Sequence, residues 1–440
     1  MKRKHILFFL ALLLFVSTTL SAVHAAEEQQ EDIILLLLSR DEAESSQALA
    51  YIIKNKPVEL IPRLRNILIS PDEENESRAI ALRALSSFSA TKYLDIWFEI
   101  LRKTPSFIIK KEIISIIIKT NNRKIIVPLV EQLSSPYYTV RESAIFALKR
   151  YGDDRMFPYI LNMARNDNPV FRVYALEAIY YLYDIRLYPI ILSLLDDPNK
   201  SVRYYALRCI EKNRLNKASS NVRSLALKDK NHEVRVKAIE VLGVLKDSSA
   251  YSVVLKCLDD SHRDIRYASV KALYKMKTRK SASPLSRQLY EETEDDIKRL
   301  IIDTLIRLKD GGGFKGLEKV LLNDQNPELR IHAAYAYGTL GNKKSLPSLL
   351  RGLRDKDYRV RAEVCSSLGQ FKDKRILPYL LGIINDDTEN YVRTASLYAI
   401  KRMKEKKAVL PLFDRYVGEK DPIFKDKLRA FLRHAIDRFI

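Results

Sequence analysis

A short motif returns every 31 or 32 residues along most of this 440-residue chain. Each copy pairs an apolar residue with a cation and opens an apolar stripe at helical spacing. The cation stands at Arg78, Lys110, Arg141, Arg172, Arg203, Arg235, Arg266, Lys298, Arg330, Arg361, Arg393 and Lys425. A fixed period of this length indicates stacked supersecondary units. The period therefore predicts a solenoid, which presents a long surface rather than one deep pocket.

Each repeat contains two predicted helices. With Val140 as position 1, positions 1, 5, 8 and 9 of the second helix are apolar or small and share one helical face. Alanine recurs at positions 5 and 8, as at Ala144 and Ala147, where a small side chain permits close helix packing. Proline often marks the start of the shorter first helix, as at Pro158, because a first helical turn tolerates proline. Acidic residues such as Asp259 and Asp260 predict a tight turn between the two helices.

This pattern resembles the HEAT-like repeats of the phycobilin-lyase type. The resemblance rests on a string of residues that occurs twice: Gly152-Asp153, Pro158, Leu161, Asp167, Val170-Phe171-Arg172 and Ala175, then Lys372-Asp373, Pro378, Leu381, Asp386-Asp387, Val392-Arg393 and Ala399. It covers about residues 33–440. The resemblance implies an all-α, right-handed α-solenoid of about 12–13 helix-turn-helix repeats, forming a single elongated domain over residues 26–440. Because such repeats serve many binding roles, the resemblance predicts the fold more sharply than the function.

The N-terminus differs from the repeats. Lys2, Arg3 and Lys4 precede an apolar run from Ile6 to Val16, and small residues follow up to Ala26. This order is typical of a secretory signal cleaved near Ala25. An uncleaved anchor is the alternative, but a spanning helix needs about 20 apolar residues. We therefore expect residues 1–25 to be a signal peptide and the mature protein to be exported, either periplasmic or secreted, without a stable membrane span.

The composition is basic, and cysteine is sparse. Removing residues 1–25 removes three cations and no acid, so the formal net charge falls from +21 to +18. Cys209, Cys257 and Cys365 stand in separate repeats and form no disulfide framework. We expect all three to pack as small hydrophobic side chains.

The recurrent cations suggest either a ladder of anion sites or a structural joint. An Asp precedes most of them at short distance: Asp196, Asp229, Asp260, Asp295, Asp324, Asp355 and Asp387. In HEAT-like repeats, the equivalent Arg commonly pairs with Asp in neighbouring turns. We therefore predict that these cations form Arg–carboxylate pairs that fix the rotation between repeats.

The candidate binding residues occupy the remaining positions of the second helix, which lines the concave face in HEAT-like solenoids. In the middle repeats they are tyrosines and cations: Tyr174, Tyr204, Tyr205, Arg208, Lys212, Tyr267, Lys271, Tyr274 and Lys275. Tyrosine and arginine are favoured in binding hot spots, and Tyr204 and Arg208, four residues apart, share a helix face. The alternative is that these tyrosines only cover the ends of thin two-helix layers.

The sequence offers no recognisable catalytic constellation. His232-Glu233 is the single His-Glu pair, whereas HEAT-like metal hydroxylases need several. Gly311-Gly312-Gly313 lacks the Gly-Lys-Ser/Thr that completes a phosphate loop. We expect a non-catalytic protein that needs no cofactor, metal or small-molecule substrate.

Two binding roles follow. The first is a protein–protein interaction scaffold outside the cytoplasm that holds a partner along the concave face. The second is a polyanion binder that uses the basic, tyrosine-bearing positions to contact an acidic polysaccharide, an anionic membrane surface or nucleic acid. The apolar stripe of the last helix, from Phe424 to Phe439, either packs inward or awaits a partner chain; we expect it to pack inward.

Overall fold

The computed structural model describes residues 28–439, and all regular structure in that part of the chain is helical. This confirms the predicted all-α solenoid. The predicted signal peptide lies outside the described residues. None of the described helices is both long enough and apolar enough to cross a membrane.

The described chain divides into two compact units, the first ending at Ile190 and the second beginning at Ile191. The single domain expected over residues 26–440 stays a prediction. After a helical stretch over residues 28–37, the first unit holds α2 (Glu42–Asn55), α3 (Ile61–Ile69), α4 (Asn75–Ser86), α5 (Leu94–Lys103), α6 (Phe107–Ile118), α7 (Ile126–Glu131), α8 (Tyr138–Tyr151), α9 (Met156–Ala164) and α10 (Pro169–Leu182). The short helix α11 (Tyr188–Ser193) contains the division.

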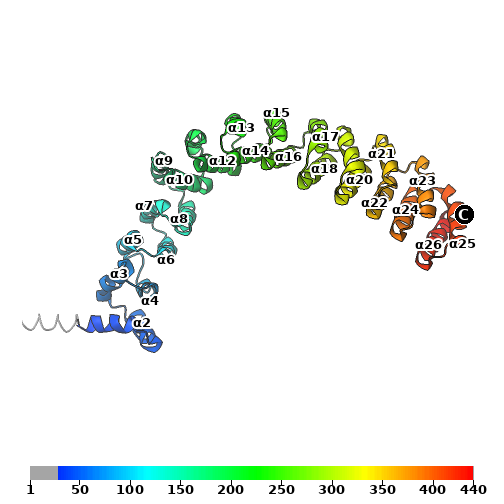
Figure 1. Cartoon of the computed structure of the whole chain (residues 1–440). Coiled ribbons are helices and arrows are strands. Elements are labelled where there is room, and N and C mark those ends of the chain that lie inside the picture. Colours follow the sequence, from blue (N-terminus) through cyan, green and yellow to red (C-terminus); the bar gives the residue numbers. More distant parts are fainter. Residues whose placement is uncertain (1–27, 440) are drawn as a thin grey trace, which may run out of the picture. The chain divides into compact units, whose positions relative to one another are not determined.

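The second unit continues the same alternation of shorter and longer helices. It holds α12 (Lys200–Asn213), α13 (Ser219–Lys228), α14 (His232–Leu245), α15 (Tyr251–Lys256), α16 (Arg263–Met276), α17 (Ala282–Glu291), α18 (Asp295–Leu308), α19 (Phe314–Asn323), α20 (Pro327–Leu340), α21 (Leu346–Gly352), α22 (Tyr358–Leu368), α23 (Leu377–Asp386), α24 (Asn390–Met403), α25 (Val409–Gly418) and α26 (Pro422–Phe439). Each repeat motif falls in the first turns of an even-numbered helix. Even-numbered helices pack on one another in series, and Figure 1 shows them on the inner side of this unit.

Local chemistry sets where these helices begin and end. The side chains of Asn199, Asn231 and Asn326 accept hydrogen bonds from backbone N–H groups in the first turns of α12, α14 and α20. At the other end of most even-numbered helices, the chain turns through a left-handed residue, such as Lys246 or Lys277, each with φ of 54°. A 3-10 turn then leads into the next helix, and Gly311-Gly312-Gly313 forms one of these turns, η10.

The predicted apolar stripes form the core. In α12, Val202, Ala206 and Ile210 have no exposed surface. Gly243 on α14 lies against the next even-numbered helix, where an added Cβ would come within 2.8 Å of the Cα of Ala272. Small residues at this contact therefore set how closely α14 and α16 approach.

The final apolar stripe packs inward as expected for its described part. Phe424 and Leu428 have no exposed surface, and Phe431 and Leu432 are buried. The side chains of Ile436 and Phe439 lie outside the described residues.

Six of the eight recurrent cations in the second unit join neighbouring repeats, whereas among residues 28–439 the side chains of Arg235 and Lys425 donate only to a backbone oxygen of their own turn. The Arg203 guanidinium donates to the backbone oxygens of Asp197 and Pro198 at 2.8 and 3.1 Å, which closes its own turn. Its other nitrogens donate to both carboxylate oxygens of Asp229 at 2.7 Å, in the next repeat. Arg330–Asp355 and Arg361–Asp387 repeat this arrangement. The cations thus belong to the scaffold, as predicted.

The structure corrects the residue type of one partner. Arg266 pairs with Glu292, at 3.0 Å to each carboxylate oxygen, rather than with an aspartate of the neighbouring turn. Glu292 lies three residues before Asp295, the first residue of α18. Its carboxylate accepts hydrogen bonds from the Gln288 side chain and from the backbone N–H groups of Thr293 and Glu294. The longer glutamate side chain therefore serves where other repeats use aspartate.

Candidate functional site

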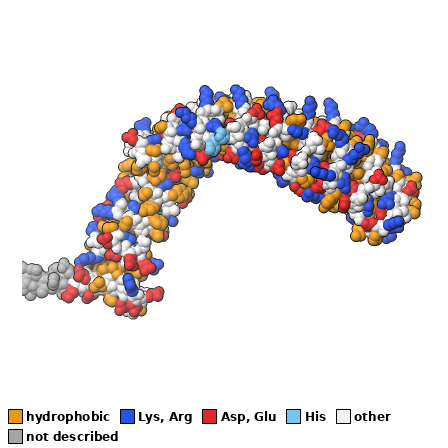
Figure 2. All heavy atoms as spheres, viewed as in Figure 1, with side chains coloured by type: hydrophobic (Ala, Val, Ile, Leu, Met, Phe, Trp, Pro, Cys, Tyr) orange, Lys and Arg blue, Asp and Glu red, His pale blue; other side chains and the backbone are white. Residues whose placement is uncertain are grey.

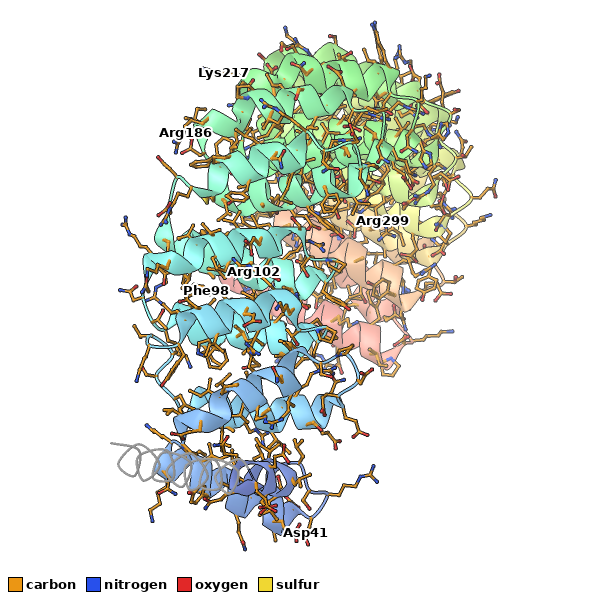
Figure 3. All side chains as sticks on the ribbon, turned by 90° about the vertical axis from the view of Figure 1, so that its left-hand side faces the viewer. Asp41, Phe98, Arg102, Arg186, Lys217 and Arg299 are labelled. Atoms are coloured by element: carbon orange, nitrogen blue, oxygen red, sulfur yellow. The ribbon has the colours of Figure 1, made fainter. Side chains whose placement is uncertain are left out.

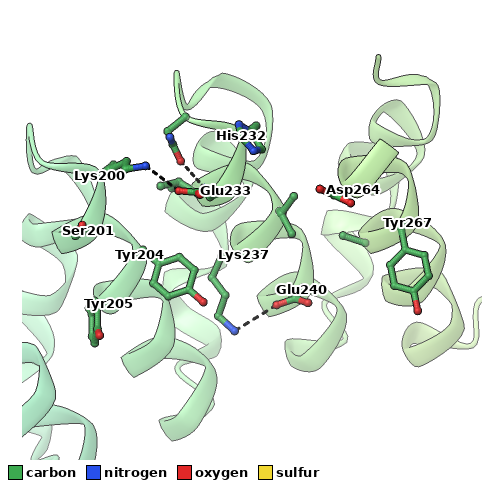
Figure 4. Close-up of a pocket in the computed structure, with 14 residues that line it drawn as sticks. Lys200, Ser201, Tyr204, Tyr205, His232, Glu233, Lys237, Glu240, Asp264 and Tyr267 are labelled. Atoms are coloured by element: carbon green, nitrogen blue, oxygen red, sulfur yellow. Dashed lines mark hydrogen bonds and ion pairs between the residues drawn. The ribbon is translucent and has the colours of Figure 1, made fainter. Parts of the chain in front are cut away.

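A groove of about 660 Å³ crosses the first turns of α12, α14 and α16 in the second unit (Figure 4). The residues that form it come from three successive repeats at matching helical positions. They are Lys200, Ser201, Tyr204, Tyr205, Asn231, His232, Glu233, Val234, Val236, Lys237, Glu240, Asp264, Tyr267 and Ala268. The repeat itself therefore builds the groove, because each even-numbered helix presents the same face to solvent.

Three tyrosines supply the aromatic surface of the groove. Tyr204 and Tyr205 meet edge to face with ring centroids 6.0 Å apart. The Arg208 guanidinium lies 5.1 Å from the Tyr205 ring centroid, and that of Arg263 lies 6.0 Å from the Tyr267 ring centroid. All three rings are partly exposed, so each offers an apolar face to a bound chain while its neighbours limit its rotamers.

A buried ammonium group lies between the tyrosines. Lys237 on α14 is 9% exposed, and its Nζ donates to Glu211 at 2.6 Å and lies 3.4 Å from Glu240. Burial alone would lower the pKa of Lys237, but the hydrogen bond to Glu211 and the charges of both glutamates raise it overall. The ammonium is therefore charged at neutral pH and already committed to the two carboxylates.

The other charges along the groove are also matched locally. Lys200 donates to Glu233 at 2.9 Å, and Asp264 accepts from Arg263 at the same distance. The lining contains three carboxylates, Glu233, Glu240 and Asp264, against two ammonium groups. Acidic and basic side chains are likewise interspersed on the face of the second unit that Figure 2 shows. The groove is mixed in charge rather than basic.

The predicted binding residues do not all come together. Tyr204, Tyr205 and Tyr267 line the groove, and Arg208 stands beside it against Tyr205. Lys212, Lys271, Tyr274 and Lys275 lie further along α12 and α16, outside the lining, and the Tyr274 hydroxyl accepts a hydrogen bond from Arg307 at 2.7 Å. Tyr174 lies on α10 in the first unit, where the Arg141 guanidinium stacks 3.8 Å from its ring centroid.

Sequence reasoning missed the acidic members of the site. Glu240 occupies position 7 of α14, the position that holds Arg208 in α12 and Lys271 in α16. Glu233 and Asp264 directly precede position 1 of their helices, where they read as turn residues. Comparing every residue type at these positions, and not tyrosine and cations alone, would have found them.

A second groove continues the same face of this unit. It has a volume of about 580 Å³ and lies between α20, α22 and α24. Tyr391, Tyr398, Arg359 and Arg402 line it together with Glu328 and Glu363. The same combination of tyrosines with charges of both signs therefore recurs, as expected of a surface made by stacking similar repeats.

The three thiols are poor nucleophiles. Burial raises the pKa of the Cys257 thiol to about 11 and that of Cys365 to about 12, and it also raises the pKa of Cys209. Because the thiolate is the reactive form, these cysteines are inert at neutral pH. Among residues 28–439, no cluster of three or more His, Cys, Asp or Glu side chains could hold a metal ion.

Comparison with known proteins identifies the repeat type. A family model of HEAT repeats matches residues 126–211, 188–264, 220–306 and 314–401, which together exceed half of the chain. The groove lies within the matched residues. The alpha subunit of phycocyanobilin lyase from Nostoc sp. (strain PCC 7120) is 32% identical over 110 residues, which are 25% of this chain and 38% of the lyase.

Solved structures with a similar fold come from larger solenoids. Kap121p matches 93% of this chain with a TM-score of 0.55 and 14% sequence identity, over 49% of its own length. Kap95p, in a structure with RanGDP, matches 93% of this chain with a TM-score of 0.50 and 14% identity, over 60% of its own length. The chain thus spans about half of these structural relatives and just over a third of the lyase, and the structural likeness concerns the fold alone.

Proposed function

Because this chain belongs to the HEAT-repeat family, we propose that it is a non-catalytic scaffold that binds a protein partner along its inner face, outside the cytoplasm. The groove of α12, α14 and α16 is the principal contact. The second groove, between α20, α22 and α24, extends the contact surface within the same unit.

The charge balance of the principal groove carries this proposal. Lys237 is paired with Glu211 and Glu240, and Lys200 with Glu233, so an incoming polyanion would gain little from these lysines and would face Glu240 and Asp264. A protein segment can supply apolar groups for the tyrosine rings and a cation for the carboxylates. The groove therefore favours a protein over the alternative, a polyanion, at this place.

The comparisons agree with a binding role. Solved structures of the neighbouring solenoids contain protein partners, RanGDP for Kap95p and Ste12p for Kap121p. The similarity to the lyase covers 38% of that protein, and the inert thiols of this chain supply no nucleophile. These observations support a scaffold rather than an enzyme.

Export rests on the N-terminal leader. The basic start, the apolar run from Ile6 to Val16 and the small residues before Ala26 support cleavage near Ala25. Intact-mass measurement of the protein recovered from its native cell tests this point. A mature N-terminus near Ala26 is expected, and a retained leader in a cytoplasmic fraction would overturn it.

Co-purification with the groove altered tests the binding role. The Tyr204→Ala, Tyr267→Ala double variant should lose the proteins that co-purify with the mature wild-type chain, because it removes both aromatic walls. The matched control is Tyr379→Ala, which removes an exposed tyrosine from the odd-numbered helix α23. Retention of the same partners by the double variant would contradict the assignment of the groove.

A further inference from the structure

We propose that the turns between successive repeats of the second unit form a binding edge for a flexible anionic polysaccharide. This inter-repeat edge comprises the segments that join each even-numbered helix to the next repeat, from α12 to α25. Sixteen exposed cations lie there: Arg214, Lys217, Lys246, Lys277, Arg279, Lys280, Lys309, Lys315, Lys343, Lys344, Lys372, Lys374, Arg375, Lys404, Lys406 and Lys407. The proposal is independent of the groove and of its protein partner.

Net charge differs between the two ends of the even-numbered helices. The carboxylates that pair with the recurrent arginines, such as Asp229 and Glu292, lie in turns at the N-terminal ends. The inter-repeat edge lies at the C-terminal ends, about 20 Å away along a 14-residue helix. Figure 3 shows Lys217, from this edge, at the outer margin of the ribbon. The N-terminal edge therefore mixes carboxylates with cations, whereas the inter-repeat edge carries a clear excess of cations.

Four carboxylates lie at the inter-repeat edge, Asp247, Asp310, Asp373 and Glu405, and the three aspartates are used locally. Asp247 accepts hydrogen bonds from Ser219 and Ser249, and Asp310 caps the N–H of Gly312 at 2.8 Å. Asp373 pairs with Arg375, and among residues 28–439 Arg375 is the one cation of the sixteen that pairs with a carboxylate. The other fifteen cations are available to a ligand.

Interaction with the helix dipole explains only some of the sixteen cations of the inter-repeat edge. Six of the cations follow the C-terminal ends of even-numbered helices, where the helix dipole favours positive charge. These six have φ between 49° and 57°, a conformation that glycine adopts with less strain. The other ten, including Lys280 and Lys344, precede or begin the odd-numbered helices, where the same dipole disfavours a cation. Their concentration there points to an external anion.

The residue types of the inter-repeat edge indicate which class of polyanion it suits. Thirteen of the sixteen cations are lysines, whose mobile point charges suit an anion without a fixed geometry. The seven 3-10 turns Asn216–Ala218, Ser248–Ala250, Arg279–Ser281, Gly311–Gly313, Lys343–Ser345, Lys374–Ile376 and Lys406–Ala408 contain no aromatic residue, whereas single-stranded nucleic acids need stacking platforms.

The geometry of the edge also favours a flexible chain. Successive repeats of a solenoid are rotated stepwise, and neighbouring helices pack about 8–10 Å apart. The row of clusters therefore follows a curve, which a flexible linear chain can trace. A planar bilayer or a stiff DNA duplex would touch only part of the row.

Binding of heparin oligosaccharides of increasing length to the mature full-length protein tests the proposal. The edge variant carries Lys280→Gln, Lys344→Gln, Lys374→Gln and Lys407→Gln. The control variant removes the same charge from exposed lysines elsewhere in the unit, with Lys228→Gln, Lys230→Gln, Lys256→Gln and Lys420→Gln. All eight side chains are exposed, so both variants should fold, as circular dichroism would verify.

We expect affinity to rise with oligosaccharide length and to fall at least about tenfold in the edge variant near 0.1 M salt, with the salt dependence reduced by about one unit per lost contact. The control variant and Tyr204→Ala should bind within about twofold of wild type. Equal losses in the edge and control variants, or no loss in either, would overturn the proposal. Tighter binding of anionic vesicles or single-stranded DNA, lost in the edge variant, would reject a polysaccharide as the ligand.

Discussion

At the scale of single residues, the recurrent arginine explains why the sequence period is so regular. The Arg203 guanidinium donates hydrogen bonds to two backbone oxygens of its own turn and to the Asp229 carboxylate of the next repeat. The equivalent pairs are separated by 25 residues at Arg330–Asp355 and by 26 at Arg361–Asp387, so the carboxylate stays within one residue of the same register. The period of 31 or 32 residues is therefore fixed by a side-chain joint as well as by helix packing.

Loss of the Arg203–Asp229 pair should destabilise the folded protein. The Arg203 and Asp229 side chains are 13% and 2% exposed, and breaking a buried pair leaves the carboxylate without its partner. We expect Arg203→Ala to lower the free energy of unfolding by about 3–5 kcal/mol. Arg351→Ala, which breaks an exposed pair with Glu318, should cost less than about 1 kcal/mol. Urea denaturation of both variants measures the difference, and equal stabilities would contradict the joint.

The joint should also respond to pH in a defined direction. Burial raises the pKa of Asp387, but the hydrogen bond from Arg361 and the backbone N–H of Glu389 lower it by more, so its pKa is lowered overall. A carboxyl with a lowered folded-state pKa adds stability above its unfolded pKa of about 4, and this stability is lost as pH falls through the folded value.

The stability difference between wild type and Arg361→Ala should therefore be full near pH 7 and shrink below about pH 4. Denaturant titrations across this range measure it. A difference that stays constant down to about pH 2 would show that the charge of Asp387 contributes nothing to the joint.

At the scale of helices, most of the architecture was predictable from spacing and turn chemistry. The motif located the start of every even-numbered helix from α4 to α26. The long-range partners of the arginines were only partly predictable. The partner lies 26 residues away, but it is an aspartate for Arg203 (Asp229) and a glutamate for Arg266 (Glu292), and the spacing alone does not tell which of the two it is. The acidic half of the groove was missed because its members read as turn residues.

Helix contact distance gives a prediction at this scale. A side chain at Gly243 would collide with Ala272 of α16, so Gly243→Leu should cost about 1–3 kcal/mol through overpacking. Gly382 is also helical, and an added Cβ there meets no atom within 4 Å. Gly382→Leu should raise the stability by up to about 1 kcal/mol, because leucine is the better helix former. Thermal melts that rank the two variants in the opposite order would contradict the packing.

At the scale of the whole molecule, each repeat depends chiefly on its neighbours. Damage to one joint should therefore remain local. In Arg203→Ala, hydrogen exchange should speed up across α12 to α14, while peptides from α22 to α26 keep their wild-type protection. Uniform loss of protection throughout the second unit would indicate a single cooperative core instead.

The groove and the inter-repeat edge were predictable to different degrees. The sequence placed tyrosines and cations on the even-numbered helices, and three of the nine candidates line the groove. The inter-repeat edge was missed because its cations lie outside the motif, in turns whose alignment becomes evident only when the repeats are stacked. Stacking thus converts scattered lysines into a continuous surface.

The central claim is that a protein partner occupies the groove of α12, α14 and α16. Site-specific photocrosslinking in the native cell tests it most directly, with a photoreactive phenylalanine analogue placed at Tyr204 or, as a control, at Tyr379. We predict that the Tyr204 position captures a defined protein that mass spectrometry can identify, and that the Tyr379 position does not capture it. Absence of a protein adduct at Tyr204, or the same adducts at both positions, would contradict the account.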